Sequence, residues 1–249
     1  MIPALRLLLR SILTIFWGLI ILFPLFVTSQ LRLARLNSGI MQFSFFIGCL
    51  IWGVRVTCRG APAKDLPLLM VSNHFSYLDV FALGSTVPAH FTPKREVANW
   101  PFIGLLCRTG GCIFIDRRPS RTLHNKSELE YALRKNYIIS LFPEGTTSDG
   151  SGLLPFKSSF FSIAEENDLM VQPVSVLYTH LNGKPVDAAA LPIIGWYGDS
   201  DFFPHATTFL MQKNVDVTLI FHTAFNGGEF ESRKELAAHC REIIAAPLA

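Results

Sequence analysis

The chain has 249 residues, enough for one α/β domain and an appendage, and only 16% of them are charged, against roughly 25% in soluble domains. Together with a hydrophobic content of 50% and a mean hydropathy of +0.35, this indicates a membrane-associated protein, and the small net charge of +3 argues against a nucleic-acid partner. The five cysteines include no Cys-x-x-Cys pair, which argues against a disulfide framework and a zinc site and favours a reducing compartment.

Two uncharged and largely apolar runs fill the N-terminal segment, one between Arg10 and Arg32 and one after Arg35. Each approaches the roughly 20 residues that a membrane-spanning helix needs. We therefore predict that residues 1–59 form a two-helix membrane anchor and that residues 60–249 form an α/β domain. A signal peptide is the weaker interpretation, because no Ala-x-Ala-like cleavage site follows the first run.

The orientation of this anchor is ambiguous. Arginines flank both ends of both runs. Because the positive charges are distributed evenly, the positive-inside rule does not indicate an orientation. A hairpin that lies in one leaflet and two ordinary membrane spans therefore both stay open. In either arrangement, the domain beyond Arg59 lies against the membrane.

From Val54 onward, apolar runs alternate with amphipathic runs. Strands are predicted at 54–58, 66–71, 111–115, 137–142, 171–178 and 215–221, and helices at 76–84, 120–134, 160–166 and 233–244, with a short helix after Trp100. Strands that alternate with helices predict an α/β fold with a mixed, largely parallel sheet flanked by helices.

The stretch from Asn73 to Asp79 lies between a predicted buried strand and a predicted helix, where open α/β sheets place their sites. A turn at this point can fold Asp79 back onto His74. A carboxylate on one ring nitrogen fixes the tautomer and leaves the other nitrogen free as a base. The alternative is a capped helix, in which Ser76 is the N-cap, Asp79 stabilises the helix N-terminus and His74 has no role.

Asn73-His74-x-Ser76-x-x-Asp79, followed by Phe142-Pro143-Glu144-Gly145-Thr146, resembles the glycerolipid acyltransferase family, whose lysophosphatidic acid acyltransferases carry an H-x4-D box. Other segments resemble further blocks of the family in the expected order: Lys94-x-Glu96, Pro101-x-x-Gly104, Gly111-x-Ile113-Phe114-Ile115-x-Arg117, Phe156-Lys157 and Val171-x-Pro173-Val174. The resemblance extends from about Arg55 to Phe221.

The resemblance implies an O-acyltransferase that moves a fatty acyl group from a thioester, acyl-CoA or acyl-ACP (acyl carrier protein), to the free hydroxyl of a lysolipid. His74 would take the hydroxyl proton, and Asp79 would orient the imidazolium and stabilise it. The residues that we assign to substrate binding on the same basis are Arg117, Glu144, Gly145, Thr146, Lys94 and Lys157. We expect no metal and no cofactor, and membrane lipids and the acyl donor as partners. The resemblance also implies a bacterial inner membrane, with the catalytic domain on the cytoplasmic face.

Two acceptor lipids stay open, because one position departs from the family pattern. The third box usually continues Glu-Gly-Thr-Arg-Ser, whereas this chain has Thr147 in place of the arginine. We predict 1-acylglycerol-3-phosphate as the acceptor, with Arg118 or Lys157 replacing the missing cation. Lyso-ornithine lipid is the alternative, because 196–199 and 203–205 are similar to a stretch in bacterial members, some of which acylate that lipid.

Two other classes of protein are less compatible with the sequence. A lipid-binding or tethering protein that had lost the chemistry predicts a damaged His-Asp pair, whereas His74 and Asp79 are both present. A hydrolase with Ser76 as nucleophile predicts a Gly-x-Ser-x-Gly elbow, which does not surround Ser76. His180 and His205 have no motif around them and are not expected to take part.

Overall fold

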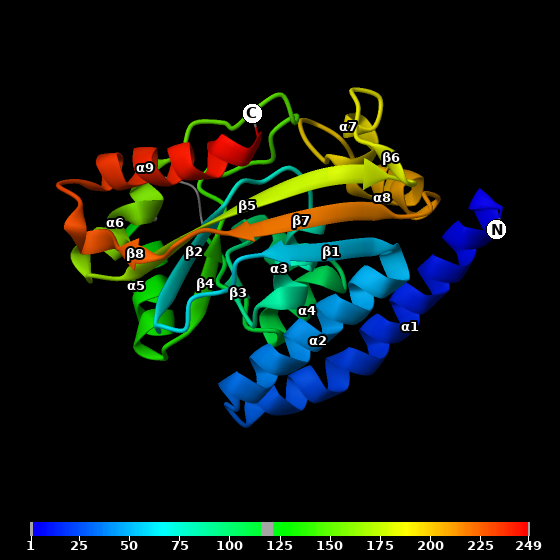
Figure 1. Ribbon diagram of the computed structural model, residues 1–249. Coiled ribbons are helices and arrows are strands. Elements are labelled where there is room, and N and C mark those ends of the chain that lie inside the picture. The colour runs from blue at the N-terminus through cyan, green and yellow to red at the C-terminus, as the bar shows by residue number, and fades with distance from the viewer. Residues whose placement is uncertain (1, 116–121, 249) are drawn as a thin grey trace.

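Eight strands form one mixed sheet in the residues that the computed structural model describes, 2–115 and 122–248 (Figure 1). The strands are β1 (Val54–Arg59), β2 (Leu68–Ser72), β3 (His90–Phe91), β4 (Ile138–Leu141), β5 (Met170–Leu181), β6 (Lys184–Pro185), β7 (Val215–Phe221) and β8 (Phe225–Asn226). The main order is β1-β7-β5-β2-β4-β3. Only the β7–β5 pair on this path is antiparallel, so the predicted mixed, largely parallel sheet is confirmed.

Helices cover both faces of the sheet and enclose two apolar cores (Figure 1). The helices are α1 (Pro3–Gln30), α2 (Ala34–Trp52), α3 (Leu78–Thr86), α4 (Ile103–Thr109), α5 (Thr122–Arg134), α6 (Ser162–Glu166), α7 (Leu191–Ile194), α8 (Phe202–Leu210) and α9 (Arg233–Ala245). In β7, the side chains of Val215, Val217 and Leu219 are buried and alternate with less buried residues, the period of two that a half-covered strand requires. In contrast, β2 is buried along its whole length, as expected of a central parallel strand.

The predicted strand at 111–115 is wrong. In the structure this segment forms a single isolated bridge, between Ile115 and Lys94. The amides of Ile113 and Ile115 donate to the carbonyl oxygens of Phe91 and Pro93, so the segment does run beside β3. Proline has no N–H to return a bond, and this interrupts the ladder before a strand can form.

The sheet begins before residue 60, where we predicted the domain to start. β1 lies within the segment assigned to the anchor, yet it pairs in parallel with β7 from Val54 to Arg59. The division that best fits this pairing places only α1 and α2 in the anchor.

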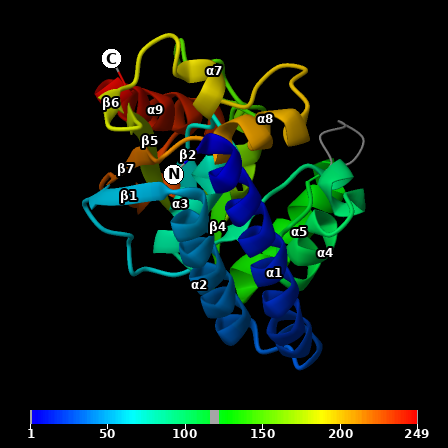
Figure 2. The ribbon, with the colours of Figure 1, turned by 90° about the vertical axis from the view of Figure 1, so that its right-hand side faces the viewer.

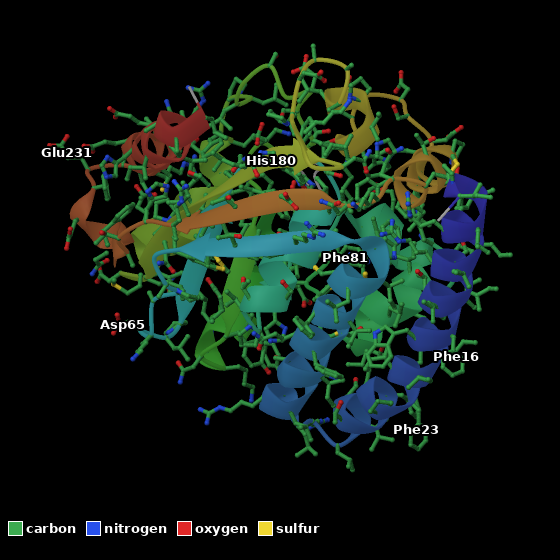
Figure 3. All side chains as sticks on the ribbon, turned by 45° about the vertical axis from the view of Figure 1, so that its right-hand side comes forward. Phe16, Phe23, Asp65, Phe81, His180 and Glu231 are labelled. Atoms are coloured by element: carbon green, nitrogen blue, oxygen red, sulfur yellow. The ribbon has the colours of Figure 1, made fainter. Side chains whose placement is uncertain are left out.

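α1 and α2 form an antiparallel hairpin that packs against α3, α4 and α8 on one side of the molecule (Figure 2). Both helices are long and apolar enough to cross a membrane by length and composition. Leu25 and Trp52 are buried, whereas Phe16 and Phe23 are 61% and 75% exposed and point away from the domain (Figure 3). The hairpin therefore has one face that joins the domain and another that is apolar and uncovered.

Polar contacts hold this hairpin to the domain at both of its ends. In the early turns of α1, the guanidinium of Arg10 donates to the carbonyl oxygens of Leu210 at 3.2 Å and Gln212 at 2.7 Å. Near the turn between the helices, the side-chain amide of Asn37 donates to the carbonyl oxygen of Thr109 at 2.9 Å. The hairpin thus lies alongside the domain over its length instead of projecting from it.

Candidate active site

His74 and Asp79 meet in the connection between the end of β2 and the first turn of α3. The Nδ1 atom of His74 lies 2.9 Å from the Oδ2 atom of Asp79, so the contact expected from the sequence is present. The alternative of a helix capped by Ser76 is wrong, because Tyr77 occupies the N-cap position and no side chain caps the helix there.

The carboxylate of Asp79 is fully buried and accepts hydrogen bonds on both oxygens. Besides His74, its Oδ2 atom accepts the backbone N–H groups of Phe75 at 2.7 Å and Ser76 at 2.9 Å. Its Oδ1 atom accepts the hydroxyl of Tyr178 at 2.5 Å. Because Asp79 is the acceptor of its bond with the imidazole, the ring hydrogen of neutral His74 lies on Nδ1. The Nε2 atom is then the nitrogen that can take a proton.

The imidazole of His74 is held from two further directions. Its ring stacks on that of Phe142, with the ring centroids 3.9 Å apart and the planes at 16°. The preceding residue, Asn73, exchanges two hydrogen bonds with the backbone of Val176 in β5, at 3.0 and 2.8 Å. The side chain of His74 stays 17% exposed, so a substrate can reach it while its orientation is fixed.

Glu144, in the loop after β4, supports the backbone around His74. Its Oε1 atom accepts the N–H of His74 at 2.7 Å, and its Oε2 atom accepts the N–H of Leu154 at 2.9 Å. The N–H of Ser148 in turn donates to the carbonyl oxygen of His74 at 2.8 Å. The loop of the Glu-Gly-Thr box is therefore joined directly to the loop of the His-Asp box.

The environment of Glu144 also perturbs its ionisation. Burial raises the pKa of this carboxyl to about 7, and the nearby charge of Asp79 acts in the same direction. The two backbone N–H groups that it accepts oppose this rise, because they stabilise the carboxylate. Near neutral pH, Glu144 is consequently present in both its neutral and its ionised form.

Gly145 and Lys157 lie against each other beside this loop. Gly145 has φ of +71°, and a Cβ at this position would lie only 2.7 Å from the Nζ atom of Lys157. The positive φ favours glycine at this position, and the absence of a side chain lets the ammonium group approach the backbone. Thr146, the next residue, is exposed. Lys157 therefore supplies a positive charge beside the loop that carries Gly145 and Thr146.

Of the remaining residues predicted to bind substrate, the structure describes Lys94 but not Arg117. Lys94 follows β3, which lies on the side of β4 away from β2, and it pairs with Ile115 at that edge of the sheet. Arg117 and Arg118 lie outside the described residues, so their role stays a prediction from the sequence. The two histidines without a motif have other partners: His180 lies 4.0 Å from Asp216, and His205 lies 3.0 Å from the hydroxyl of Tyr77.

Sequence reasoning missed the two aromatic residues that contact the His-Asp pair. Phe142 is part of the third box, but nothing in its motif predicts stacking on His74. Tyr178 lies beyond the Val171-x-Pro173-Val174 block, at the end of the strand predicted at 171–178. Its contact with Asp79 depends on β5 lying next to β2, with Val174 paired to Ser72. The box order in the sequence carries no information on this register.

Taken together, these groups can perform general-base chemistry on a hydroxyl. His74 presents one free ring nitrogen, and Asp79 lies behind the ring as a buried anion. An imidazole held in this way can take a proton from an alcohol and return it to a leaving group. An acyl group that arrives as a thioester is already activated, so a base, positioning and stabilisation of the oxyanion suffice.

Comparison with known proteins agrees with this chemistry. The sequence matches the family described as Acyltransferase over residues 54–177. It is 34% identical over 199 residues to a lyso-ornithine lipid O-acyltransferase of Rhizobium meliloti (strain 1021), which covers 77% of this chain and 68% of the relative. It is 31% identical over 194 residues to a 1-acyl-sn-glycerol-3-phosphate acyltransferase of Neisseria gonorrhoeae, which covers 76% of this chain and 73% of the relative.

The fold has a counterpart among known structures. The crystal structure of the 1-acyl-sn-glycerophosphate (LPA) acyltransferase PlsC from Thermotoga maritima matches with a TM-score of 0.64 over 96% of both chains, at 19% identity. The family match begins with β1 and ends within β5, so it contains both the His74–Asp79 pair and the loop of Glu144. The chain therefore belongs to the acyltransferase family that includes PlsC, and it is an acyltransferase.

Proposed function

We propose that this acyltransferase transfers a fatty acyl group from acyl-CoA or acyl-ACP to the free hydroxyl of lyso-ornithine lipid. This reverses the order of the two acceptors that we predicted from the sequence. Thr147, a neutral residue where the family's third box usually has arginine, carries the new order, in agreement with the 34% identity to a lyso-ornithine lipid O-acyltransferase. The amide of its neighbour Ser148 donates to the backbone of His74, so position 147 lies close to the reacting groups. A cation at this position suits a phosphate, whereas a neutral residue tolerates the ammonium of an ornithine head group.

In this proposal the reaction is a direct transfer. The Nε2 atom of His74 takes the hydroxyl proton while the hydroxyl oxygen forms a bond to the thioester carbonyl carbon. The carbon–sulfur bond then breaks, and His74 returns the proton to the departing thiolate. Asp79 stays ionised throughout and stabilises the imidazolium that forms between the two proton transfers.

A second candidate acceptor is 1-acylglycerol-3-phosphate, which would give phosphatidate. The ammonium of Lys157 next to Gly145 favours it, because it places a positive charge beside the Glu-Gly-Thr box. The sequence prediction of Arg117 as a phosphate ligand belongs to the same candidate, since a guanidinium binds phosphate through two parallel bonds. Both acceptors use the same His74–Asp79 chemistry and differ in the head group.

Replacing Thr147 with arginine distinguishes the two acceptors. With lyso-ornithine lipid, we expect Thr147→Arg to lower kcat/KM about fivefold, because like charges about 4 Å apart in water repel by about 1 kcal/mol. With 1-acylglycerol-3-phosphate, the same change is expected to leave kcat/KM unchanged or to raise it. The measurement is the rate of product formation by the purified protein with each acceptor, followed by mass spectrometry.

The matched control is Thr147→Gln, which adds length without charge and should leave use of lyso-ornithine lipid within twofold of the wild type. Equal losses in the glutamine and arginine variants would show that bulk, and not charge, matters at this position. Turnover of 1-acylglycerol-3-phosphate by the wild type, with no turnover of lyso-ornithine lipid, would reject the proposed acceptor.

We also propose that the α1–α2 hairpin lies in one leaflet, on the cytoplasmic side of a bacterial inner membrane, where acyl thioesters are available. The support is the pair of polar attachments at its two ends, through Arg10 and Asn37, which keep both helices beside the domain. A spanning hairpin would break the attachment of Asn37, because the turn between the helices would then lie on the side of the membrane opposite the domain. A hairpin in one leaflet keeps its uncovered apolar face in lipid and its inner face on the domain.

The uncovered face of α1 provides a test of this arrangement. Replacing Phe16 and Phe23 together with glutamate should move most of the protein from vesicles to the supernatant. Each phenylalanine is more than half exposed, so the change removes lipid contact without opening the core. The measurement is co-sedimentation with phospholipid vesicles, with circular dichroism as a check of folding.

The control for this test is Tyr131→Glu, which changes an aromatic residue that is 62% exposed on α5. It should leave vesicle binding intact. Unchanged binding of the double glutamate variant would show that another surface attaches the protein to the membrane.

A further inference from the structure

The two oxygens of the Asp79 carboxylate have different partners. The Oδ2 atom accepts hydrogen bonds from His74 and from two backbone amides of the same loop. Residues close to Asp79 in the sequence therefore hold this oxygen in position. The Oδ1 atom accepts the hydroxyl of Tyr178, which comes from a different strand. Tyr178 is therefore the contact through which β5 acts on the pair.

The position of Tyr178 in β5 explains how its hydroxyl reaches Asp79. The pairing of β5 with β7 is regular up to Tyr178 and then shifts register before His180. Bulges of this kind redirect side chains and occur often beside active sites. The ring of Tyr178 packs edge-on against Phe75, with the centroids 5.5 Å apart, which fixes its direction.

The environment of Tyr178 keeps its hydroxyl protonated near neutral pH, so that it can donate. Burial raises the pKa of Tyr178 well above its usual range, and the adjacent charge of Asp79 raises it further. A short O–H···O bond to a carboxylate is about twice as strong as a bond between neutral groups. Without this hydroxyl, the buried Oδ1 atom of Asp79 would lose a hydrogen bond.

We propose that Tyr178 is a positioning residue for acyl transfer: its hydroxyl holds the Oδ1 atom of Asp79 and thereby sets both the orientation of His74 and its affinity for a proton. The inference rests on the proposed acyl transfer through His74, and it adds a third member to the pair. Tyr178 acts through Asp79 and is not expected to touch the substrates.

The variant Tyr178→Phe removes the hydroxyl and keeps the ring. In the full-length protein assayed with the lysolipid acceptor and acyl-CoA, kcat should fall about 10- to 100-fold, and the KM of each substrate should change by less than twofold. This division between kcat and KM is expected because the lost bond orients the base and does not bind substrate.

The pH dependence of kcat/KM distinguishes a positioning role of Tyr178 from a purely structural one. Without the hydroxyl, the charge of Asp79 is shared with fewer donors and stabilises the imidazolium more strongly. The acid limb of the kcat/KM profile should therefore move to higher pH by at least about half a unit. Partial unfolding of the variant would reduce the height of the profile without moving its midpoint, so this test survives a loss of stability.

Other ionisable groups near His74, Asp79 or Tyr178 can contribute to the same pH profile of kcat/KM. Glu144, which accepts the backbone N–H of His74, has a pKa of about 7 and also titrates in this range. Tyr77 and Cys49 act on Tyr178 through their charges, which raise the pKa of its hydroxyl. All three are unchanged in Tyr178→Phe, so the difference between the two profiles isolates the contribution of the hydroxyl.

Tyr131→Phe is the matched control, because it removes the hydroxyl of a tyrosine that is 62% exposed on α5, outside the His74–Asp79 loop and β5. It should leave kcat, KM and the acid limb unchanged. A second comparison places Tyr178→Phe in an Asp79→Asn background. In that background, the additional loss in kcat should be less than about threefold, because the effects of substituting two residues that act through one another are not additive.

The outcomes separate this inference from the proposed function. A wild-type kcat with an unchanged acid limb in Tyr178→Phe would overturn the inference alone, and so would a raised KM with unchanged kcat. A lowered kcat with an unmoved acid limb would also overturn it, since that pattern indicates looser packing. Failure of the wild type to acylate any lysolipid would instead reject the proposed function.

Discussion

Replacing His74 with alanine is expected to lower kcat for acyl transfer by about 10²–10⁴-fold, the range typical for loss of a general base. The Nδ1 atom of His74 contacts the carboxylate of Asp79 and its side chain is partly exposed, so Nε2 is the nitrogen that can take the hydroxyl proton. α1 and α2, the proposed membrane anchor, are well separated in sequence from this loop. The variant should therefore stay bound to membranes while it loses its activity.

The measurement is the turnover of acyl-CoA by purified protein in lipid–detergent micelles, together with vesicle co-sedimentation. The matched control is His180→Ala, which changes a histidine that is 45% exposed in its side chain and lies near Asp216. It should retain activity within twofold of the wild type. If His74→Ala retained more than about a tenth of wild-type turnover, His74 would not be the base.

Replacing Asp79 with asparagine should lower kcat about 10²–10⁴-fold with little change in KM. The amide oxygen of asparagine can still accept the N–H groups of Phe75 and Ser76, so the loop is expected to keep its shape. A neutral amide, however, cannot stabilise the imidazolium that forms on His74. The side-chain amide also turns a donor toward Tyr178, where the carboxylate accepted a hydrogen bond.

Steady-state kinetics with both substrates varied will separate kcat from KM for Asp79→Asn. Asp65→Asn is the control, because Asp65 is exposed on the connection before β2, away from the α1–α2 hairpin (Figure 3). It should behave as the wild type. A raised KM with an unaltered kcat in Asp79→Asn would assign Asp79 to substrate binding and contradict its proposed role.

Features that depend on residues near one another in the chain could be predicted from the sequence. The contact between His74 and Asp79 closes within one turn between a strand and a helix, so the spacing and the flanking apolar runs sufficed. The largely parallel sheet followed from the alternation of strands and helices. The two apolar helices followed from uncharged runs of the right length, because hydrophobic periodicity and length are local properties.

Features that depend on sheet order or on side-chain packing were decided only by the tertiary structure. β1 belongs to the sheet because β7, far along the chain, provides its partner, and this moves the start of the sheet ahead of residue 60. The predicted strand at 111–115 was wrong because its neighbour contains Pro93, which cannot donate to a ladder. The attachment of the α1–α2 hairpin to the domain likewise depends on the partners of Arg10 and Asn37, which lie far along the chain.

The surroundings of the His74–Asp79 pair show the same division. Phe142, Glu144 and Tyr178 all contact it, and they come from the ends of β4 and β5, the two strands that flank β2. The sequence by itself determined that His74 and Asp79 lie in contact, because the two residues are local in the chain. Only the tertiary structure decided what orients that pair, because those contacts exist only once parallel strands from distant parts of the chain are aligned in register.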